Sequence, residues 1–151
     1  MQIPSSVGAA VRRSCAGVAL VFLAACTSAC RQAPPLEAPG LKELQRASSG
    51  AVTVVLLAGG DALKSGKDTA YLEFRSGGDQ QLVDVGTVKV SATMPMAGMP
   101  PMMGSMFVHD TQTPGRYSID TDLGMVGTWQ IGVEWNGAAG TGKVTFPGNV
   151  Q

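Results

Sequence analysis

The sequence predicts an all-β domain, specifically an immunoglobulin-like β-sandwich of about seven strands. From Ala51 onward, several segments alternate apolar and polar residues with a period of two, and none sustains the 3.6-residue period of a helix. Turn signals rich in glycine and proline separate these segments. A chain of 151 residues suits one domain with an appendage. We therefore assign the sandwich domain to residues 51–147.

The strands follow one another at short intervals. Residues 52–57 are continuously apolar, as in a central strand. The alternating segments are 71–75, 87–91, 116–120, 129–135 and 144–146. Trp129 begins the clearest of them, in which every odd-numbered residue is large and apolar, and we expect its ring to fill the centre of the sandwich. Tyr117, on the alternating segment just upstream in the sequence, is expected to have a structural role.

The first 25 residues predict an export signal. The basic pair Arg12-Arg13 precedes a short apolar core at residues 18–23, which is much shorter than the ~20 apolar residues of a transmembrane helix. The sequence Leu23-Ala24-Ala25-Cys26 then resembles the bacterial lipobox, in which the cysteine is lipidated and becomes the first residue of the mature chain. We predict a lipoprotein signal peptide at residues 1–25 and lipidation at Cys26, with ordinary secretion as the alternative.

The lipobox implies a location. Thr27, rather than aspartate, follows the cysteine, and this resembles lipoproteins sorted to the outer membrane of Gram-negative bacteria. Acyl chains would then hold the protein on the bacterial cell envelope, facing the periplasm. Residues 26–50 carry several prolines and are predicted to be a tether, with one or two helical turns between Leu41 and Ala47. Cys30 has no partner for a disulfide or metal site and receives no role.

Charge and composition exclude several functions. Eleven basic and eleven acidic residues leave no net charge, and therefore no basic surface typical of nucleic-acid binding. One histidine and three cysteines argue against a zinc site rich in histidine and against a histidine-dependent catalytic triad. The sequence contains neither a convincing catalytic carboxylate pair nor a phosphate-binding loop. We predict that the protein is not an enzyme.

Methionine is the chemically distinctive residue. Six of the eight methionines lie between Met94 and Met106, among prolines and glycines that would restrict a loop. A thioether is a soft, neutral ligand that favours Cu(I) or Ag(I) over Zn(II), Mg(II) or Ca(II). The candidate ligands in this loop are Met96, Met99, Met102, Met103 and Met106. His109 follows three residues later and is a candidate nitrogen ligand.

Two other interpretations of the same residues remain open. Met94 and Met96 continue the inward phase of the preceding strand, which favours packing in the core. Methionine also suits adaptable protein–protein surfaces, so a segment with six of them among prolines is typical of a docking patch.

Three motifs together resemble the YtkA-like family over residues 52–146. They are Met94-Pro95-Met96-Ala97-Gly98-Met99, Pro114-Gly115-Arg116-Tyr117 and Leu123-Gly124-Met125-Val126-Gly127-Thr128-Trp129. The resemblance implies a small immunoglobulin-like domain of the bacterial envelope, similar to proteins of copper handling and oxidase assembly. Such domains also occur attached to periplasmic adaptor subunits of heavy-metal efflux pumps. The resemblance adds Met125 to the candidate ligands.

Together, these patterns predict a membrane-tethered periplasmic domain that binds Cu(I) or Ag(I) weakly through its methionine-rich loop. The expected context is heavy-metal efflux or copper homeostasis, with an efflux or copper-handling envelope protein as partner. The alternative is a metal-free interaction module that docks on an envelope partner through the same methionine- and proline-rich patch.

Overall fold

The computed structural model describes residues 40–151, and these form an all-β domain of eight strands. The predicted signal peptide, Cys26, Cys30 and most of the predicted tether lie outside the described residues. The strands are β1 (Lys42–Ser49), β2 (Val52–Ala58), β3 (Gly66–Ser76), β4 (Thr87–Met96), β5 (Met99–Asp110), β6 (Arg116–Leu123), β7 (Gly127–Gly137) and β8 (Gly140–Val150). Within residues 40–151, no helix is long and apolar enough to cross a membrane.

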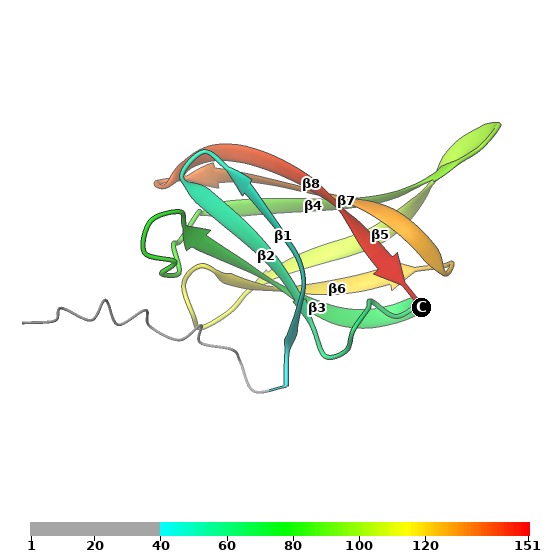
Figure 1. The fold of residues 1–151 in the computed structure, drawn as a ribbon, viewed down its shortest axis with the longest axis horizontal. Helices are drawn as coiled ribbons and strands as arrows, with labels where there is room; N and C mark the ends of the chain where they lie inside the picture. Colours follow the sequence, from blue (N-terminus) through cyan, green and yellow to red (C-terminus); the bar gives the residue numbers. More distant parts are fainter. Residues whose placement is uncertain (1–39) are drawn as a thin grey trace, which may run out of the picture. The chain divides into compact units, whose positions relative to one another are not determined.

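The strand order confirms the predicted immunoglobulin-like sandwich. Neighbouring strands run antiparallel in the order β1-β2-β3-β6-β5-β4-β7-β8. The strands β2-β3-β6-β5 form one layer and β5-β4-β7-β8 the other, which reproduces the two sheets of an immunoglobulin domain (Figure 1). These seven strands account for the predicted number, and β1 adds an eighth at the edge of the first layer.

Strand β5 joins the two layers. Its first half, up to Gly104, pairs with β4, and its second half, from Ser105 onward, pairs with β6. A strand that changes partner in this way closes one side of a sandwich, because it belongs to both sheets. The change of partner also leaves the first half of β5 and the end of β4 paired only with each other.

The core lies between the layers and consists of alternating inward side chains. Trp129 is fully buried, and Phe74 contacts both Tyr117 and Trp135 edge-on, with ring centroids 5.4 Å and 5.5 Å apart. The Tyr117 hydroxyl donates to the backbone oxygen of Gly86 at 3.0 Å, which satisfies the polar end of the ring in the core. The odd-numbered residues of β7 from Trp129 to Trp135 are all buried, as their alternation predicts.

The strands of the structure extend beyond the predicted domain, residues 51–147, at both ends. Residues 42–49 form β1, which pairs with β2 along its length, and are neither part of the tether nor helical turns. The sequence pattern did not predict this strand, because a strand at a sheet edge buries few side chains. In β1, only Leu44 and Ala47 pack against the core. At the other end, β8 continues to Val150. Two backbone hydrogen bonds hold this end, from Leu63 N–H to the Asn149 carbonyl and from Gln151 N–H to the Leu63 carbonyl.

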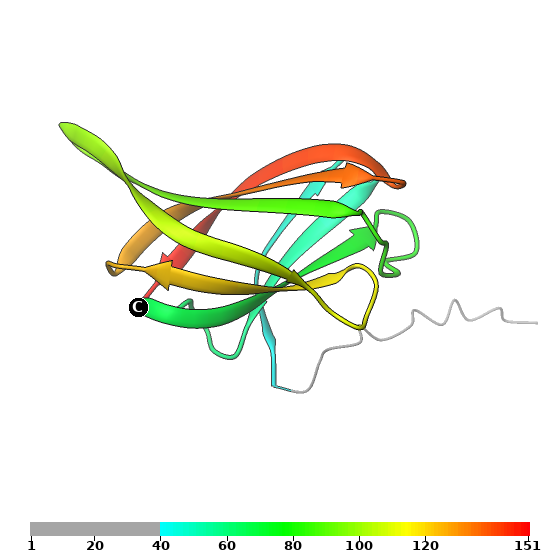
Figure 2. The same ribbon diagram turned by 180° about the vertical axis from the view of Figure 1, so that it is seen from behind.

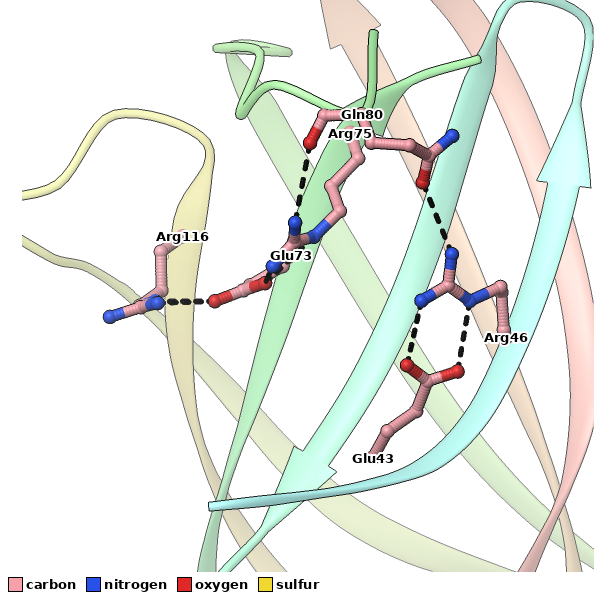
Figure 3. Close-up of polar contacts among 6 residues, drawn as sticks. All are labelled: Glu43, Arg46, Glu73, Arg75, Gln80 and Arg116. Atoms are coloured by element: carbon pink, nitrogen blue, oxygen red, sulfur yellow. Dashed lines mark hydrogen bonds and ion pairs between the residues drawn. The ribbon is translucent and has the colours of Figure 1, made fainter. Parts of the chain in front are cut away.

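A buried ion cluster links β3 and β6 (Figure 3). The Glu73 side chain is fully buried and accepts hydrogen bonds from Arg75 Nε at 3.0 Å and Arg116 Nε at 2.8 Å. The exposed pair Glu43 and Arg46 lies beside it on β1, where Arg46 Nε and Nη2 donate to the two different carboxylate oxygens of Glu43. Because Arg116 is the first residue of β6, the cluster lies at the end of this strand away from the β6–β7 loop.

Candidate metal site on the β4–β5 hairpin

The methionine-rich segment is a β-hairpin that projects beyond the sandwich, whereas the sequence predicted a loop. Strands β4 and β5 are joined by a turn at Ala97 and Gly98, and the hairpin extends past the neighbouring strands (Figure 2). Gly98 has a φ of 73°, a backbone conformation that favours glycine. No charged residue occurs from Val90 to Val108, so the projecting part of the hairpin is electrically neutral.

The pairing of the two strands places methionines opposite one another. Met94 is the cross-strand partner of Met102, and Met96 is the partner of Met99. Cross-strand partners project from the same face of an antiparallel pair, with Cβ atoms about 4.5–5.5 Å apart. Met94 and Met96 also share a face, because they are two residues apart on one strand. The four side chains therefore form one set, which we call the thioether ladder.

A bulge in the hairpin makes this arrangement possible. Between the two methionine pairs, β4 advances by two residues, from Met94 to Met96, while β5 advances by three, from Met99 to Met102. In a regular strand, residues three apart point to opposite faces. The extra residue at Pro100-Pro101 restores the phase, so that Met99 and Met102 lie on the same face.

The inner pair of the ladder, Met94 and Met102, packs against the body of the domain. Both side chains are partly buried and contact the hydrophobic core. Met94 lies directly on Gly127, where an added methyl group would come within 2.6 Å of Met94 Cε. Gly104, on the same face of β5, leaves equally little space, because a methyl group there would lie 2.5 Å from Leu123 Cδ2. The inner pair is thus fixed by packing.

The outer pair, Met96 and Met99, flanks the turn of the hairpin. Met99 is 58% exposed, and Met96 is partly exposed. A ligand would therefore reach the ladder at Met99, whereas Met94, Met96 and Met102 are all half-buried.

The β6–β7 loop borders the base of the ladder. Met125 lies in this loop with 42% of its surface exposed, two residues before the glycine on which Met94 packs. The indole Nε1 of Trp129 donates to the backbone oxygen of Met125 at 3.0 Å, which fixes the loop against the core. The structure thus brings the predicted candidate Met125 to the same end of the sandwich as the hairpin.

Three predicted ligands do not belong to the ladder. Met103 is paired with Thr93 and points to the opposite face of the hairpin, where it is 68% exposed. Met106 shares the ladder's face but lies within the body of β5, opposite Thr121, and packs on the core. His109 lies six residues from Met103, roughly 20 Å along the strand, and its Nε2 is 3.1 Å from Asp120 Oδ2.

Met94 is the residue that sequence reasoning left out of the ligand set. Its inward phase indicated packing in the core, and the structure shows that it packs there. The same residue is also the cross-strand partner of a predicted ligand. The two-residue turn at Ala97-Gly98 alone would place Met94 opposite Pro101, so it is the bulge in β5 that brings Met94 opposite Met102.

The prolines of the hairpin limit what else its strands can bind. Pro95, Pro100 and Pro101 have no backbone N–H, and they lie where β4 and β5 have lost their outer partners. Proline on an exposed edge hinders the addition of a further strand. The hairpin therefore offers its side chains, rather than its backbone, as binding groups.

The ladder can supply soft sulfur ligands. Among residues 40–151, no three His, Cys, Asp or Glu side chains gather closely enough to hold a metal ion. The thioethers suit a soft monovalent ion such as Cu(I) or Ag(I) and suit hard, oxygen-preferring ions poorly. They carry no proton in the biological pH range, so binding would depend little on pH.

Fold and site together define a small immunoglobulin-like domain with a methionine-lined hairpin. The sequence pattern of the YtkA-like family matches residues 46–134, more than half of the chain, and the chain belongs to this family. The match confirms the resemblance seen in the sequence motifs. None of the curated proteins compared with the chain matches it. Among solved structures, the chain is similar to PcoC, a methionine-rich copper resistance protein from Escherichia coli, with 17% identity over 60% of this chain and 88% of that chain and a TM-score of 0.40.

Proposed function

We propose that this protein binds Cu(I) or Ag(I) through the thioether ladder of the β4–β5 hairpin. The observation that carries the proposal is the strand register, which places Met94 opposite Met102 and Met96 opposite Met99 on one face. Four thioethers gathered in this way form a ligand set that the sequence alone leaves scattered over nine residues. Met125, at the base of the hairpin, is an additional candidate ligand.

The surroundings of the ladder favour weak, exchangeable binding. Met99 of the outer pair is open to solvent near the tip of the hairpin, and no anionic side chain between Val90 and Val108 adds charge attraction for a cation. An ion held only by neutral ligands at an accessible position can pass to another protein. This chemistry suits a domain that transfers or shields an ion better than one that stores it.

The cellular setting belongs to the same proposal. We propose a periplasmic domain on the bacterial envelope, tethered to a membrane through lipidated Cys26 and acting in heavy-metal efflux or copper homeostasis. Its support is the sequence of the leader, Leu23-Ala24-Ala25-Cys26, and membership of the YtkA-like family. The partner would be an envelope protein that exchanges a soft ion with the ladder.

A titration of the full chain tests the proposal. Ag(I), or Cu(I) under anaerobic conditions, is added in the presence of a competing chelator, and binding is compared for the wild type and a variant with Met94, Met96, Met99 and Met102 replaced by Leu. Leucine has nearly the volume of methionine but lacks the sulfur, so the hairpin should keep its packing. We expect the wild type to compete for the ion and the fourfold variant to lose this ability.

Met103→Leu is the matched control. Met103 belongs to the same strand and is even more exposed than Met99, but it points to the other face of the hairpin. Its replacement should leave the affinity unchanged. Binding that survives in the fourfold variant, or that Met103→Leu abolishes, would contradict the proposed site.

A second candidate function has an observation of its own. Met103 and Phe107 are 68% and 64% exposed on the face of β5 opposite the ladder, which metal binding does not use. Exposed apolar side chains in an uncharged segment are typical of a docking surface for another protein. If the titration shows no binding of either ion, a metal-free interaction module becomes the better account of the hairpin.

A further inference from the structure

The sulfur atoms of the hairpin differ in their accessibility to solvent. Met99 and Met103 are 58% and 68% exposed, whereas Met94 and Met102 are partly buried against the core. The rate at which a methionine is oxidised follows its exposure. The hairpin therefore presents two readily oxidised sulfurs on opposite faces, and only Met99 belongs to the thioether ladder.

The oxidation itself is a simple oxygen transfer. The thioether sulfur attacks one oxygen of a peroxide, the O–O bond breaks, and an S–O bond forms while the peroxide is reduced to water or an alcohol. Methionine becomes methionine sulfoxide, a polar group that methionine sulfoxide reductases can convert back. Its sulfur has given up a lone pair, so it is a poorer donor for a soft ion such as Ag(I).

We propose that Met99 is an oxidant-sensitive modification site that switches off the outer half of the ladder. This inference rests on the proposed function, since the ladder must bind an ion for the switch to matter. Peroxides are the class of oxidant involved. Met103 is oxidised alongside Met99 without effect on ion binding, because it points to the opposite face of the hairpin.

Packing protects the inner half of the ladder. The methyl end of Met94 faces Gly127, where even one added methyl group would lie within 2.6 Å of Met94 Cε. Met102 shares this face with Gly104, which lies against Leu123. The inner pair therefore stays reduced under conditions that oxidise the tip.

The first part of the test maps oxidation without any metal. The full chain is treated briefly with dilute hydrogen peroxide, digested, and analysed by mass spectrometry for peptides that have gained oxygen. Sulfoxide should appear first at Met99 and Met103 and clearly later at Met94 and Met102. Equal rates at all four positions would overturn the inference.

The second part measures Ag(I) affinity before and after the same treatment. In metal sites, mutation of a residue that only hydrogen-bonds a ligand lowers metal affinity by roughly 10–100-fold. Oxidation of a ligand itself should therefore lower the Ag(I) affinity of the wild type by at least about tenfold. Met103→Leu should lose as much as the wild type, and methionine sulfoxide reductases should restore both. Met99→Leu should keep, after oxidation, the affinity that it had before.

The two parts distinguish failure of the switch from failure of the proposed function. If the untreated wild type does not bind Ag(I), the proposed function is wrong, while the order of oxidation still identifies Met99 as a modification site. If the wild type binds Ag(I) and Met99→Leu loses further affinity on oxidation, the sensitive sulfur lies elsewhere. That result would overturn the assignment to Met99 and leave the proposed function intact.

Discussion

Replacing the buried carboxylate of Glu73 by an amide should destabilise the domain strongly. In the folded protein, Glu73 accepts hydrogen bonds from Arg75 and from Arg116 (Figure 3). Glu73→Gln keeps the size of the side chain but removes its charge, and it turns an N–H donor towards one of two guanidinium groups. Both arginines would then retain their charge at a site built around an anion.

The structure sets the expected magnitude. Removing one partner of a buried ion pair costs about 3–5 kcal/mol, because a charge is left without compensation. The side chains of Arg75 and Arg116 are 11% and 18% exposed, so water can partly compensate for the missing carboxylate. We therefore expect a loss near the lower end, about 3 kcal/mol in the free energy of unfolding. In a domain of this size, such a loss lowers Tm by roughly 10–20 °C.

Urea unfolding followed by tryptophan fluorescence measures this loss, because Trp129 and Trp135 are both buried. Glu43→Gln is the matched control, since Glu43 accepts two hydrogen bonds from an arginine, Arg46, at the surface. Exposed ion pairs contribute about 0.2–1 kcal/mol, so the control should change stability little. Equal losses in the two variants would refute the argument that burial decides the contribution of the ion pair.

Two further predictions concern packing and pH. Gly104→Ala should cost about 1–3 kcal/mol of stability in the same assay, because the new methyl group meets Leu123 and Trp129; unchanged stability would show that the base of the hairpin can move. Burial, followed by the Asp84 carboxylate, raises the pKa of Tyr117 above its ordinary value. Folding therefore favours the neutral phenol, and its contribution is complete below about pH 10 and is lost as the pH rises through the folded-state pKa. Stability measured between neutral and alkaline pH should fall more in the wild type than in Tyr117→Phe, and parallel curves would contradict this assignment.

The fold could be predicted because apolar and polar residues that alternate with a period of two indicate a strand with one buried face. The alternation from Trp129 to Trp135 identified a strand with one buried face, and the continuous apolar run of β2 identified a central strand. Strand β1 escaped prediction, because an edge strand buries little and its residues alternate poorly. The first half of β5 escaped as well, since its prolines and glycines are typical of a loop.

By itself, the sequence determined the excess of methionine, its concentration between Met94 and Met106, and the soft-ligand chemistry that follows from thioethers. It could not determine which sulfurs face each other. That depended on the turn at Ala97-Gly98, which sets the register, and on the bulge at Pro100-Pro101, which brings Met99 and Met102 to one face. Only tertiary structure decided which methionines make up the proposed ligand set, because a shift of one residue in a strand moves a side chain to the opposite face.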